Sequence, residues 1–109
     1  MTKRFLPTKR TEGGNLLGYI TCSYATLVRA FGEPTKSDGY KTSSEWSIID
    51  VFTGRTLSIY DYKQTNMYDS SCPSVQAFRE QPSAEWHIGG IKRPDFDALR
   101  EFILSFDAE

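Results

Sequence analysis

Residues 45–63, EWSIIDVFTGRTLSIYDYK, contain two β-rich runs separated by a short stretch with a glycine. Ile, Val, Trp and Tyr dominate both runs, and Gly54 lies between them. This composition is typical of a hairpin, and it predicts β-strands at Glu45–Phe52 and Thr56–Lys63. A hairpin of this kind belongs to an antiparallel sheet, and other elements have to cover its apolar face.

The segment SYATLVRAFGEP, residues 23–34, predicts a helix with both ends marked. Ser23 or Thr21 can serve as the N-cap, since either side chain can accept from an unpaired backbone N–H. Gly32 supplies a left-handed closing residue, and Pro34 prevents continuation of the helix. One apolar stripe follows the i, i+3, i+4, i+7 spacing of a buried face, namely Tyr24, Leu27, Val28 and Phe31.

The remaining segments complete the sheet and its cover. Apolar runs predict strands at Leu16–Cys22 and Glu85–Ile88, and an apolar stripe predicts a last helix at Asp95–Phe106. Gln64–Ala84 is predicted to be a long loop with one short helix around Ser74–Arg79, and loops of this length often carry function. The order β-α-β-β-β-α predicts an α+β fold: a small antiparallel sheet of three to four strands with two helices packed on one face.

A chain of 109 residues has room for one domain. Its first ten residues carry four cations and no acid, and a turn cluster rich in glycine follows them. We therefore predict a basic flexible arm at 1–15, a single α+β domain at 16–106 and an acidic tail at 107–109. The arm is either simply solvated or binds phosphate or an acidic partner.

The formal net charge of −1 argues against a protein whose main task is to coat nucleic acid. Contact with nucleic acid is expected only through the basic arm. Cys22 and Cys72 lack CxxC spacing, so free thiols in a reducing compartment are favoured over a disulfide. The sequence shows neither a signal peptide nor an apolar run of about 20 residues that would span a bilayer. We expect a soluble intracellular protein with no membrane partner.

The hairpin also contains a pattern of acids and a lysine that suggests catalysis. Asp50, Asp61 and Lys63 follow the order found in restriction-endonuclease-like phosphodiesterases, and Glu33 could be a third acid. In that class the carboxylates hold a divalent cation such as Mg²⁺, and the lysine positions or activates water. The competing interpretation is an ordinary hairpin with charges at its solvated ends, and the sequence favours this second interpretation.

The register of the hairpin decides between these interpretations, because side chains alternate between the two faces of a strand. A two-residue turn at Gly54-Arg55 would make Asp50 and Asp61 diagonal neighbours on one face, about 7–8 Å apart. A three-residue turn that begins at Thr53 would put them on opposite faces. The apolar pattern leaves both registers open.

Aromatic residues interleave with cations between residues 40 and 87. This mixture suits stacking on a base or anchoring a protein partner. His87 is the only histidine, which argues against a zinc site, and it is either a structural or a ligand-contacting residue. Gly89-Gly90 after it would allow close approach of a backbone or ligand. The candidate binding residues are Tyr40, Lys41, Trp46, Tyr60, Tyr62, Lys63, Trp86 and His87.

Four stretches within residues 18–104 resemble a family of small proteins encoded by bacteriophages and large DNA viruses: GYITCSYATLVRAFGEP, YKTSSEW, IYDYK and EWHIGG. The resemblance implies a viral origin and an α+β domain, and no established activity comes with it. KRFLPTKR and DSSCPSVQAFREQPSA depart from the pattern, so no partner is carried over. The helix followed by a Trp-bearing strand is also loosely similar to small periplasmic inhibitor and outer-membrane-assembly domains, which have signal peptides.

The leading hypothesis is a small non-enzymatic viral protein in the host cytoplasm. It would bind and inhibit a host defence or metabolic factor, or bind a viral protein. The same surface could instead sequester a nucleotide signal, with aromatic residues stacking and Lys41 or Lys63 on phosphate. The alternatives are a metal-dependent nuclease and a minor virion component whose arm threads into a neighbouring subunit. No cofactor is expected, except Mg²⁺ for the nuclease.

Overall fold

The structure of the protein, a computed structural model, describes residues 3–9, 14–35 and 42–107. The α+β class predicted from the sequence is confirmed, although the described residues form five strands and three helices rather than three to four strands and two helices. Along the chain these are β1 (Phe5–Pro7), β2 (Asn15–Cys22), α1 (Tyr24–Phe31), β3 (Glu45–Asp50), β4 (Arg55–Tyr60), α2 (Val75–Arg79), β5 (Ala84–Gly90) and α3 (Phe96–Leu104).

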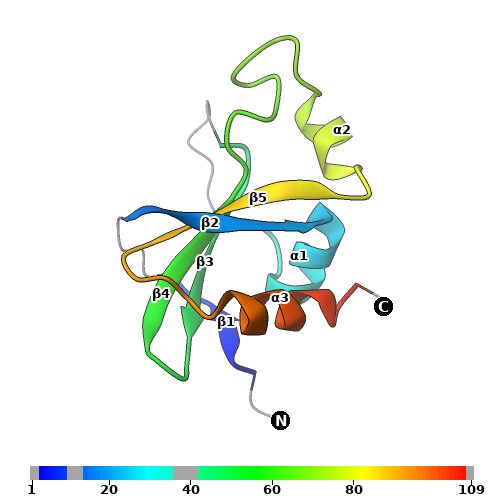
Figure 1. Ribbon diagram of the computed structural model, residues 1–109. Coiled ribbons are helices and arrows are strands. Elements are labelled where there is room, and N and C mark those ends of the chain that lie inside the picture. The colour runs from blue at the N-terminus through cyan, green and yellow to red at the C-terminus, as the bar shows by residue number, and fades with distance from the viewer. Residues whose placement is uncertain (1–2, 10–13, 36–41, 108–109) are drawn as a thin grey trace.

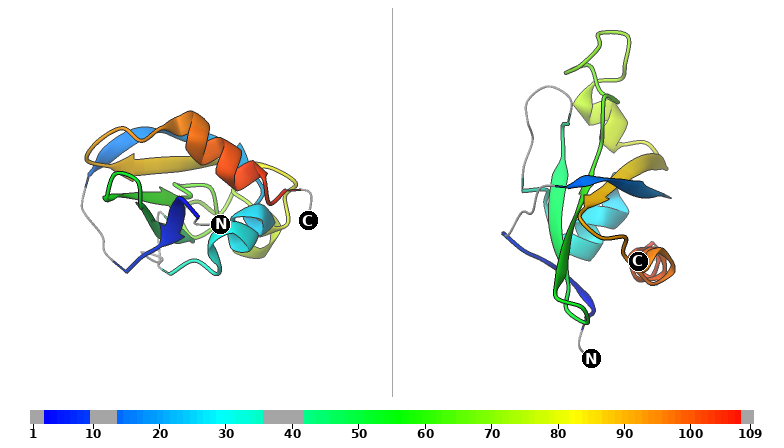
Figure 2. Two further views of the ribbon diagram at one scale, coloured as in Figure 1. Left: turned by 90° about the horizontal axis from the view of Figure 1, so that it is seen from below. Right: turned by 60° about the vertical axis from the view of Figure 1, so that its left-hand side comes forward.

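The strands form one antiparallel sheet in the order β1-β3-β4-β5-β2 (Figure 1). β2 and β3 follow each other in the chain but are separated in the sheet by β4 and β5, and α1 lies on the connection between them. Figure 2 shows α1 and α3 on the same face of the sheet. No helix of the described residues lies on the opposite face, which we call the open face.

The core lies between the sheet and these two helices. Successive side chains of a strand point to opposite faces, and every second residue of the three central strands is buried toward the helices. Trp46 and Trp86 are 1% and 0% exposed, and their rings pack edge to face at 5.5 Å. The other large members of this core are Phe5, Ile20, Leu27, Phe31, Ile48, Leu57, Ile59, Phe78, Ile88, Leu99 and Ile103.

The ends of the helices follow from local chemistry. The Ser23 hydroxyl caps α1 by accepting from the backbone N–H of Thr26 at 3.0 Å, as one of the two predicted caps would. Gly32 closes this helix at a φ of 83°, a conformation that other residues rarely adopt. Asp95 caps α3 by accepting from the N–H of Ala98 at 3.0 Å.

The prediction that residues 1–15 form an arm outside the domain is wrong for residues 4–7. Here β1 pairs with β3, with Phe5 opposite Asp50. The Phe5 side chain is 1% exposed and packs edge to face on Phe102 of α3, at 5.5 Å between ring centroids. The hydrophobic gain from burying an aromatic ring therefore holds this segment in the sheet.

The predicted acidic tail at 107–109 is also partly integrated into the domain. Asp107 accepts a 2.8 Å hydrogen bond from the hydroxyl of Thr26, which is fully buried in α1. Arg29 of the same helix donates to the backbone oxygen of Phe106 at 2.8 Å. These contacts join the C-terminal end of α3 to α1.

Within the described residues, no helix has the length and apolar character needed to cross a membrane.

Candidate functional site

The hairpin between β3 and β4 has a register that differs from both predicted possibilities. Asp50 pairs with Arg55, so four residues, 51–54, form the turn. The turn closes through a 2.7 Å hydrogen bond from the N–H of Gly54 to the oxygen of Asp50. Asp61 continues the ladder at the other end, where its N–H donates to Ser44. Since Asp50 lies six residues beyond Ser44 on β3, the two acids are about 20 Å apart along the strand.

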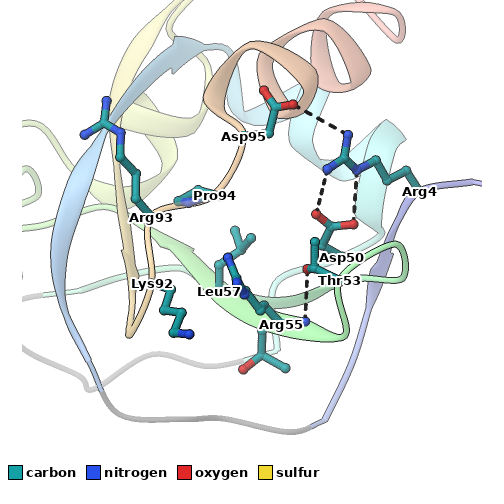
Figure 3. Close-up of a pocket in the computed structure, with 10 residues that line it drawn as sticks. Arg4, Asp50, Thr53, Arg55, Leu57, Lys92, Arg93, Pro94 and Asp95 are labelled. Carbon is teal, nitrogen blue, oxygen red and sulfur yellow. Dashed lines mark hydrogen bonds and ion pairs between the residues drawn. The ribbon is translucent and has the colours of Figure 1, made fainter.

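The carboxylate of Asp50 forms a structural ion pair (Figure 3). Arg4 donates to both of its carboxylate oxygens, at 3.1 and 3.0 Å, and the backbone N–H of Phe52 donates at 3.0 Å. Burial by itself would raise the pKa of the Asp50 carboxyl, but these hydrogen bonds and the charge of Arg4 outweigh burial and lower the pKa. The ion pair of Asp50 therefore holds β1 against the hairpin turn.

Asp61 has a structural role at the opposite end of the hairpin. It is fully buried, and its carboxylate accepts from the backbone N–H groups of Ser43 and Ser44 at 2.9 and 2.8 Å and from the Ser43 hydroxyl at 2.7 Å. The Ser44 hydroxyl accepts from Arg79 of α2 at 2.9 Å. This network joins the segment before β3 to the segment after β4 and to α2.

The nuclease arrangement of Asp50, Asp61 and Lys63 is therefore not formed. The carboxylates are too far apart to share a cation, and the register that would have made them neighbours is not adopted. In the part of the chain that the structure describes, no group of three or more His, Cys, Asp or Glu residues could hold a metal ion. The physical reason is the turn, which is longer than either predicted turn and moves Asp50 and Asp61 to opposite ends of the ladder.

The structure divides the candidate binding residues into three groups. Trp46 and Trp86 are core residues, so their assignment to a binding surface is wrong. Each indole N–H is also satisfied internally, by the oxygen of Gly32 at 2.8 Å and that of Cys22 at 2.9 Å. Tyr40 and Lys41 lie outside the described residues. The remaining four come together on or beside the open face: Tyr60, Tyr62, Lys63 and His87.

His87 lies at the centre of an aromatic cluster on the open face. Its ring centroid is 5.5 Å from that of Tyr60, 5.4 Å from that of Tyr62 and 4.9 Å from that of Tyr19. Strand pairing explains this arrangement, because His87 of β5 is opposite Tyr19 of β2 on one side and Tyr60 of β4 on the other. We call these four residues the tyrosine face. Tyr19 is 46% exposed and Tyr62 37%.

Gly89 makes room for this cluster. A Cβ atom at Gly89 would lie 2.9 Å from the Ser58 hydroxyl oxygen and 3.2 Å from the ring of Tyr60. The neighbouring side chains thus fill the space that a residue with a side chain would need. At Gly90, a Cβ would be 3.1 Å from the side chain of Leu17. The close approach that the two glycines predicted is therefore made by residues of the protein itself.

The polar atoms of the tyrosine face are partly desolvated. Burial lowers the pKa of His87 against the opposing charges of Glu85 and Asp61, so the neutral ring is favoured. Its Nδ1 is buried and makes no hydrogen bond with the residues that the structure describes. Burial also raises the pKa of Tyr60, with the charge of Glu45 adding to the effect. The surface therefore presents neutral aromatic rings.

Lys63 stands at the border of this surface in a left-handed conformation, with a φ of 59°. Its ammonium lies 5.1 Å from the ring centroid of Tyr62 and 4.9 Å from that of Tyr68. The hydrogen bond to Tyr68, followed by the charges of Tyr62 and Tyr68, raises the pKa of Lys63. The Lys63 side chain thus packs over the rings of Tyr62 and Tyr68 and places a positive charge at the border of the tyrosine face.

Sequence reasoning did not single out Tyr19, which completes the tyrosine face. Its strand alternates between buried Ile20 and Cys22 and exposed Tyr19 and Thr21, so alternation alone could have placed Tyr19 on the open face. Its meeting with His87 depends on the pairing of β2 with β5, which no local pattern encodes. Comparisons of this chain with protein-family models and with curated proteins give no match.

Proposed function

We propose that this chain is a non-enzymatic binding protein that recognises a partner protein through the tyrosine face. The observation that carries the proposal is the cluster of Tyr19, Tyr60, Tyr62 and His87 on the open face of the sheet. Tyrosine offers a large rigid contact area with few rotatable bonds, and it is enriched among residues that dominate binding energy. The sheet beneath holds these rings in place before any partner arrives.

The charges around the cluster favour a protein over a nucleotide at this surface. The negative charges of Glu85 and Asp61 both act on His87. Lys63, the cation beside them, already lies over two tyrosine rings. A phosphate bound here would meet two carboxylates, whereas a partner with Lys or Arg side chains would meet complementary charge and aromatic rings.

The viral family that the sequence resembles supplies the setting for this proposal. In the cytoplasm of an infected host the partner would be a defence or metabolic factor of the host, or another viral protein. Binding would inhibit the partner by covering the surface that it needs for its own activity. The virion alternative has lost its motivating observation, because residues 4–7 of the supposed free arm belong to the protein's own sheet. The nuclease alternative has lost its arrangement of acids.

The test compares the wild-type protein with Tyr19→Ser/Tyr62→Ser and with Phe52→Ser. Phe52 is 70% exposed in the hairpin turn, away from the tyrosine face, and serves as a matched control. A partner captured from host lysate is identified, purified and titrated with all three proteins by calorimetry. We expect the double variant to bind at least about 30-fold more weakly, since hot-spot residues contribute about 2 kcal/mol or more. The control should keep its affinity, and equal binding by all three proteins would refute the proposal.

A further inference from the structure

The two edges of the sheet differ in their protection against pairing with another strand. β1 forms one edge with three residues, one of which is Pro7, a residue without a backbone N–H. β2 forms the other edge with eight residues, none of them charged or a proline (Figure 1). A bulge between Leu16 and Gly18 leaves a regular run from Gly18 to Cys22. Short length, proline and charge are the usual protection of a sheet edge, so β2 is open to pairing.

The hydrogen bonds of the inner strands fix the direction in which β5 presents its backbone. The N–H of Asp61, next to the end of β4, donates to the oxygen of Ser44, next to the start of β3. Since the backbone groups of successive residues in a strand point to opposite sides, those of Tyr60 point to β5. Tyr60 is opposite His87, and in such a pair each residue directs its groups at the other. His87 therefore directs its N–H and C=O toward β4.

The same alternation shows which groups of β2 point away from the sheet. His87 is also opposite Tyr19, and because His87 faces β4, Tyr19 directs its N–H and C=O outward. Thr21, two residues further on, does the same. A separate contact agrees, because the Gln64 side chain, beyond the end of β4, donates at 2.7 Å to the oxygen of Glu85, which is opposite Thr21. No hydrogen bond from residues 3–9, 14–35 or 42–107 reaches these outward groups.

A groove accompanies this edge on the side of the helices. A cavity of about 220 Å³ lies there, with Gly18 of β2 and Phe96 of α3 in its wall. A Cβ atom at Gly18 would lie 2.6 Å from the tip of the Phe96 ring. The ring thus occupies the place of a side chain on β2, and it forms an apolar floor beside the outward backbone groups.

The charges beside the edge differ between the two faces of the sheet. On the helix side the cavity is lined by Arg93, Asp97 and Arg100. Arg100 pairs with Asp97 at 3.3 Å, whereas Arg93 lies over the Phe96 ring at 4.7 Å and has no acidic partner within the described part of the chain. On the open face the nearest charge is that of Glu85, opposite Thr21. A strand added here would meet positive charge on one face and negative charge on the other.

We propose that the β2 edge binds an extended segment of the partner protein, which pairs with Tyr19 and Thr21 as an additional strand. This inference rests on the proposed function for the existence of a protein partner, and it specifies how that partner binds. In this mode backbone hydrogen bonds supply affinity, and side chains at alternate positions supply specificity.

The charges determine the chemistry of the bound segment. Its residue opposite Gly18 points toward α3 and carries a carboxylate for Arg93. Its residue opposite Tyr19 lies on the open face and carries a cation, which suits the tyrosine ring and Glu85. A second copy of β2 contains no acid that could meet Arg93, so charge complementarity favours a different chain.

The first experiment titrates a blocked hexapeptide, Val-Thr-Val-Lys-Glu-Thr, into the full chain, followed by ¹⁵N-resolved NMR. When the peptide runs antiparallel to β2, its Glu is opposite Gly18 and its Lys is opposite Tyr19. We expect saturable binding in the millimolar range or tighter, with the largest shifts at residues 17–22 and 93–100. The control peptide Val-Thr-Val-Glu-Lys-Thr has the same composition with the two charges exchanged. It should bind at least about fivefold more weakly.

N-methylation of the peptide tests the strand pairing itself. The N–H of the Lys would donate to the oxygen of Tyr19, whereas the N–H of the Val before it points away from β2. A methyl group on the Lys nitrogen should therefore weaken binding at least about tenfold, and one on that Val nitrogen less than about threefold. Both peptides are titrated into the wild-type protein, so no substitution can disturb the fold.

Thr21→Pro tests the same pairing from the side of the protein. The N–H of Thr21 points outward and takes no part in the ladder with β5, so proline should leave the urea midpoint close to that of the wild type. Affinity for the peptide should fall at least about tenfold, because a donor is lost and the ring obstructs the edge. Thr21→Val keeps the N–H and should change affinity less than about twofold.

The edge and the tyrosine face can fail separately. A captured partner that is weakened by Tyr19→Ser/Tyr62→Ser but unaffected by Thr21→Pro would leave the tyrosine face standing and remove the edge. A peptide that binds with the expected methylation pattern, beside a partner indifferent to both tyrosine substitutions, would remove the proposed function alone. Three further results would overturn the edge proposal: absence of saturation, equal affinity of the two methylated peptides, or a dimer of the free chain that Thr21→Pro dissociates.

Discussion

At the scale of single residues, the two acids of the hairpin show how burial decides the role of a side chain. Asp61 would be costly to bury alone, yet three donors from Ser43 and Ser44 surround its carboxylate. Two of these donors are backbone N–H groups, which also need acceptors when they are buried. The carboxylate is therefore a structural bridge, and its oxygens are occupied.

Asp61→Ala should destabilise the protein strongly for this reason. It leaves up to three donors without their acceptor, and we expect a loss of about 3–5 kcal/mol in the free energy of unfolding. Urea denaturation followed by tryptophan fluorescence measures this loss. Asp69→Ala is the control, because the Asp69 carboxylate is exposed and among the described residues accepts only from nearby Ser71. This substitution should shift stability by about 1 kcal/mol or less. A loss below about 1 kcal/mol for Asp61→Ala would contradict the structural role.

At the scale of elements, β1 shows how a strand of three residues can be essential to a sheet. Phe5 points into the core and contacts Phe102 of α3, while Leu6 points outward and is 38% exposed. The strand therefore covers the edge of β3 and fills part of the space under the helices. Because it is short and at an edge, it also limits the unpaired backbone that could join another sheet.

Phe5→Ala tests whether this strand belongs to the domain. We expect a loss of about 3–5 kcal/mol in unfolding free energy, the usual range for removing a buried aromatic ring. Leu6→Ala, in the neighbouring position on the opposite face, should lose about 1 kcal/mol or less. Thermal unfolding and urea denaturation of the two variants give the comparison. Similar small effects for both would mean that residues 4–7 do not contribute to the core.

At the scale of the whole molecule, charged residues near both ends of the chain bind residues in its central elements. Arg4 connects β1 to the hairpin turn through Asp50 and to the start of α3 through Asp95. Asp107 connects the end of α3 to α1 through Thr26. Each contact joins segments far apart in sequence, so these charges help to hold the two helices against the sheet.

The stability of the whole molecule should fall in acid, and Asp50 should account for part of the fall. Its pKa in the folded protein is below the ordinary value of 3.8, so its contribution is complete above about pH 5 and is lost as the pH falls through the folded pKa. Asp50→Asn should be less stable than the wild type at pH 7, and the gap should narrow as the pH falls below the ordinary carboxyl pKa of 3.8. Urea midpoints from pH 7 to about pH 2.5 measure the gap.

Asp97→Asn is the control for this acid series, since the Asp97 side chain is almost fully exposed and its one ion pair within residues 3–9, 14–35 and 42–107 is with Arg100 on the same helix. Its stability should follow that of the wild type at every pH. A gap between Asp50→Asn and the wild type that stayed constant from neutral to acid pH would contradict an ionised, paired Asp50.

Local chemistry in the sequence was enough to predict the helix at Tyr24–Phe31 with its Ser23 and Gly32 ends, the strands of the hairpin and the α+β class. Caps, closing glycines and apolar periodicity act over a few residues, so they can be recognised without knowing what lies nearby. Three of the four residues of the tyrosine face, Tyr60, Tyr62 and His87, were candidates for the same reason, because they lie in or beside strands that could be recognised.

Only the tertiary structure decided which of these residues meet. The apolar alternation of the two strands is compatible with several turn lengths, so it could not show that Asp50 and Asp61 lie at opposite ends of the hairpin. Trp46 and Trp86 have the residue type of a binding surface, but the packing of α1 and α2 against the sheet covers them. Tyr19 reaches His87, and Arg4 reaches Asp50, through pairing between strands distant in sequence. The sequence alone thus determines the elements, whereas long-range packing determines the core and the sites, because burial and register depend on partners far along the chain.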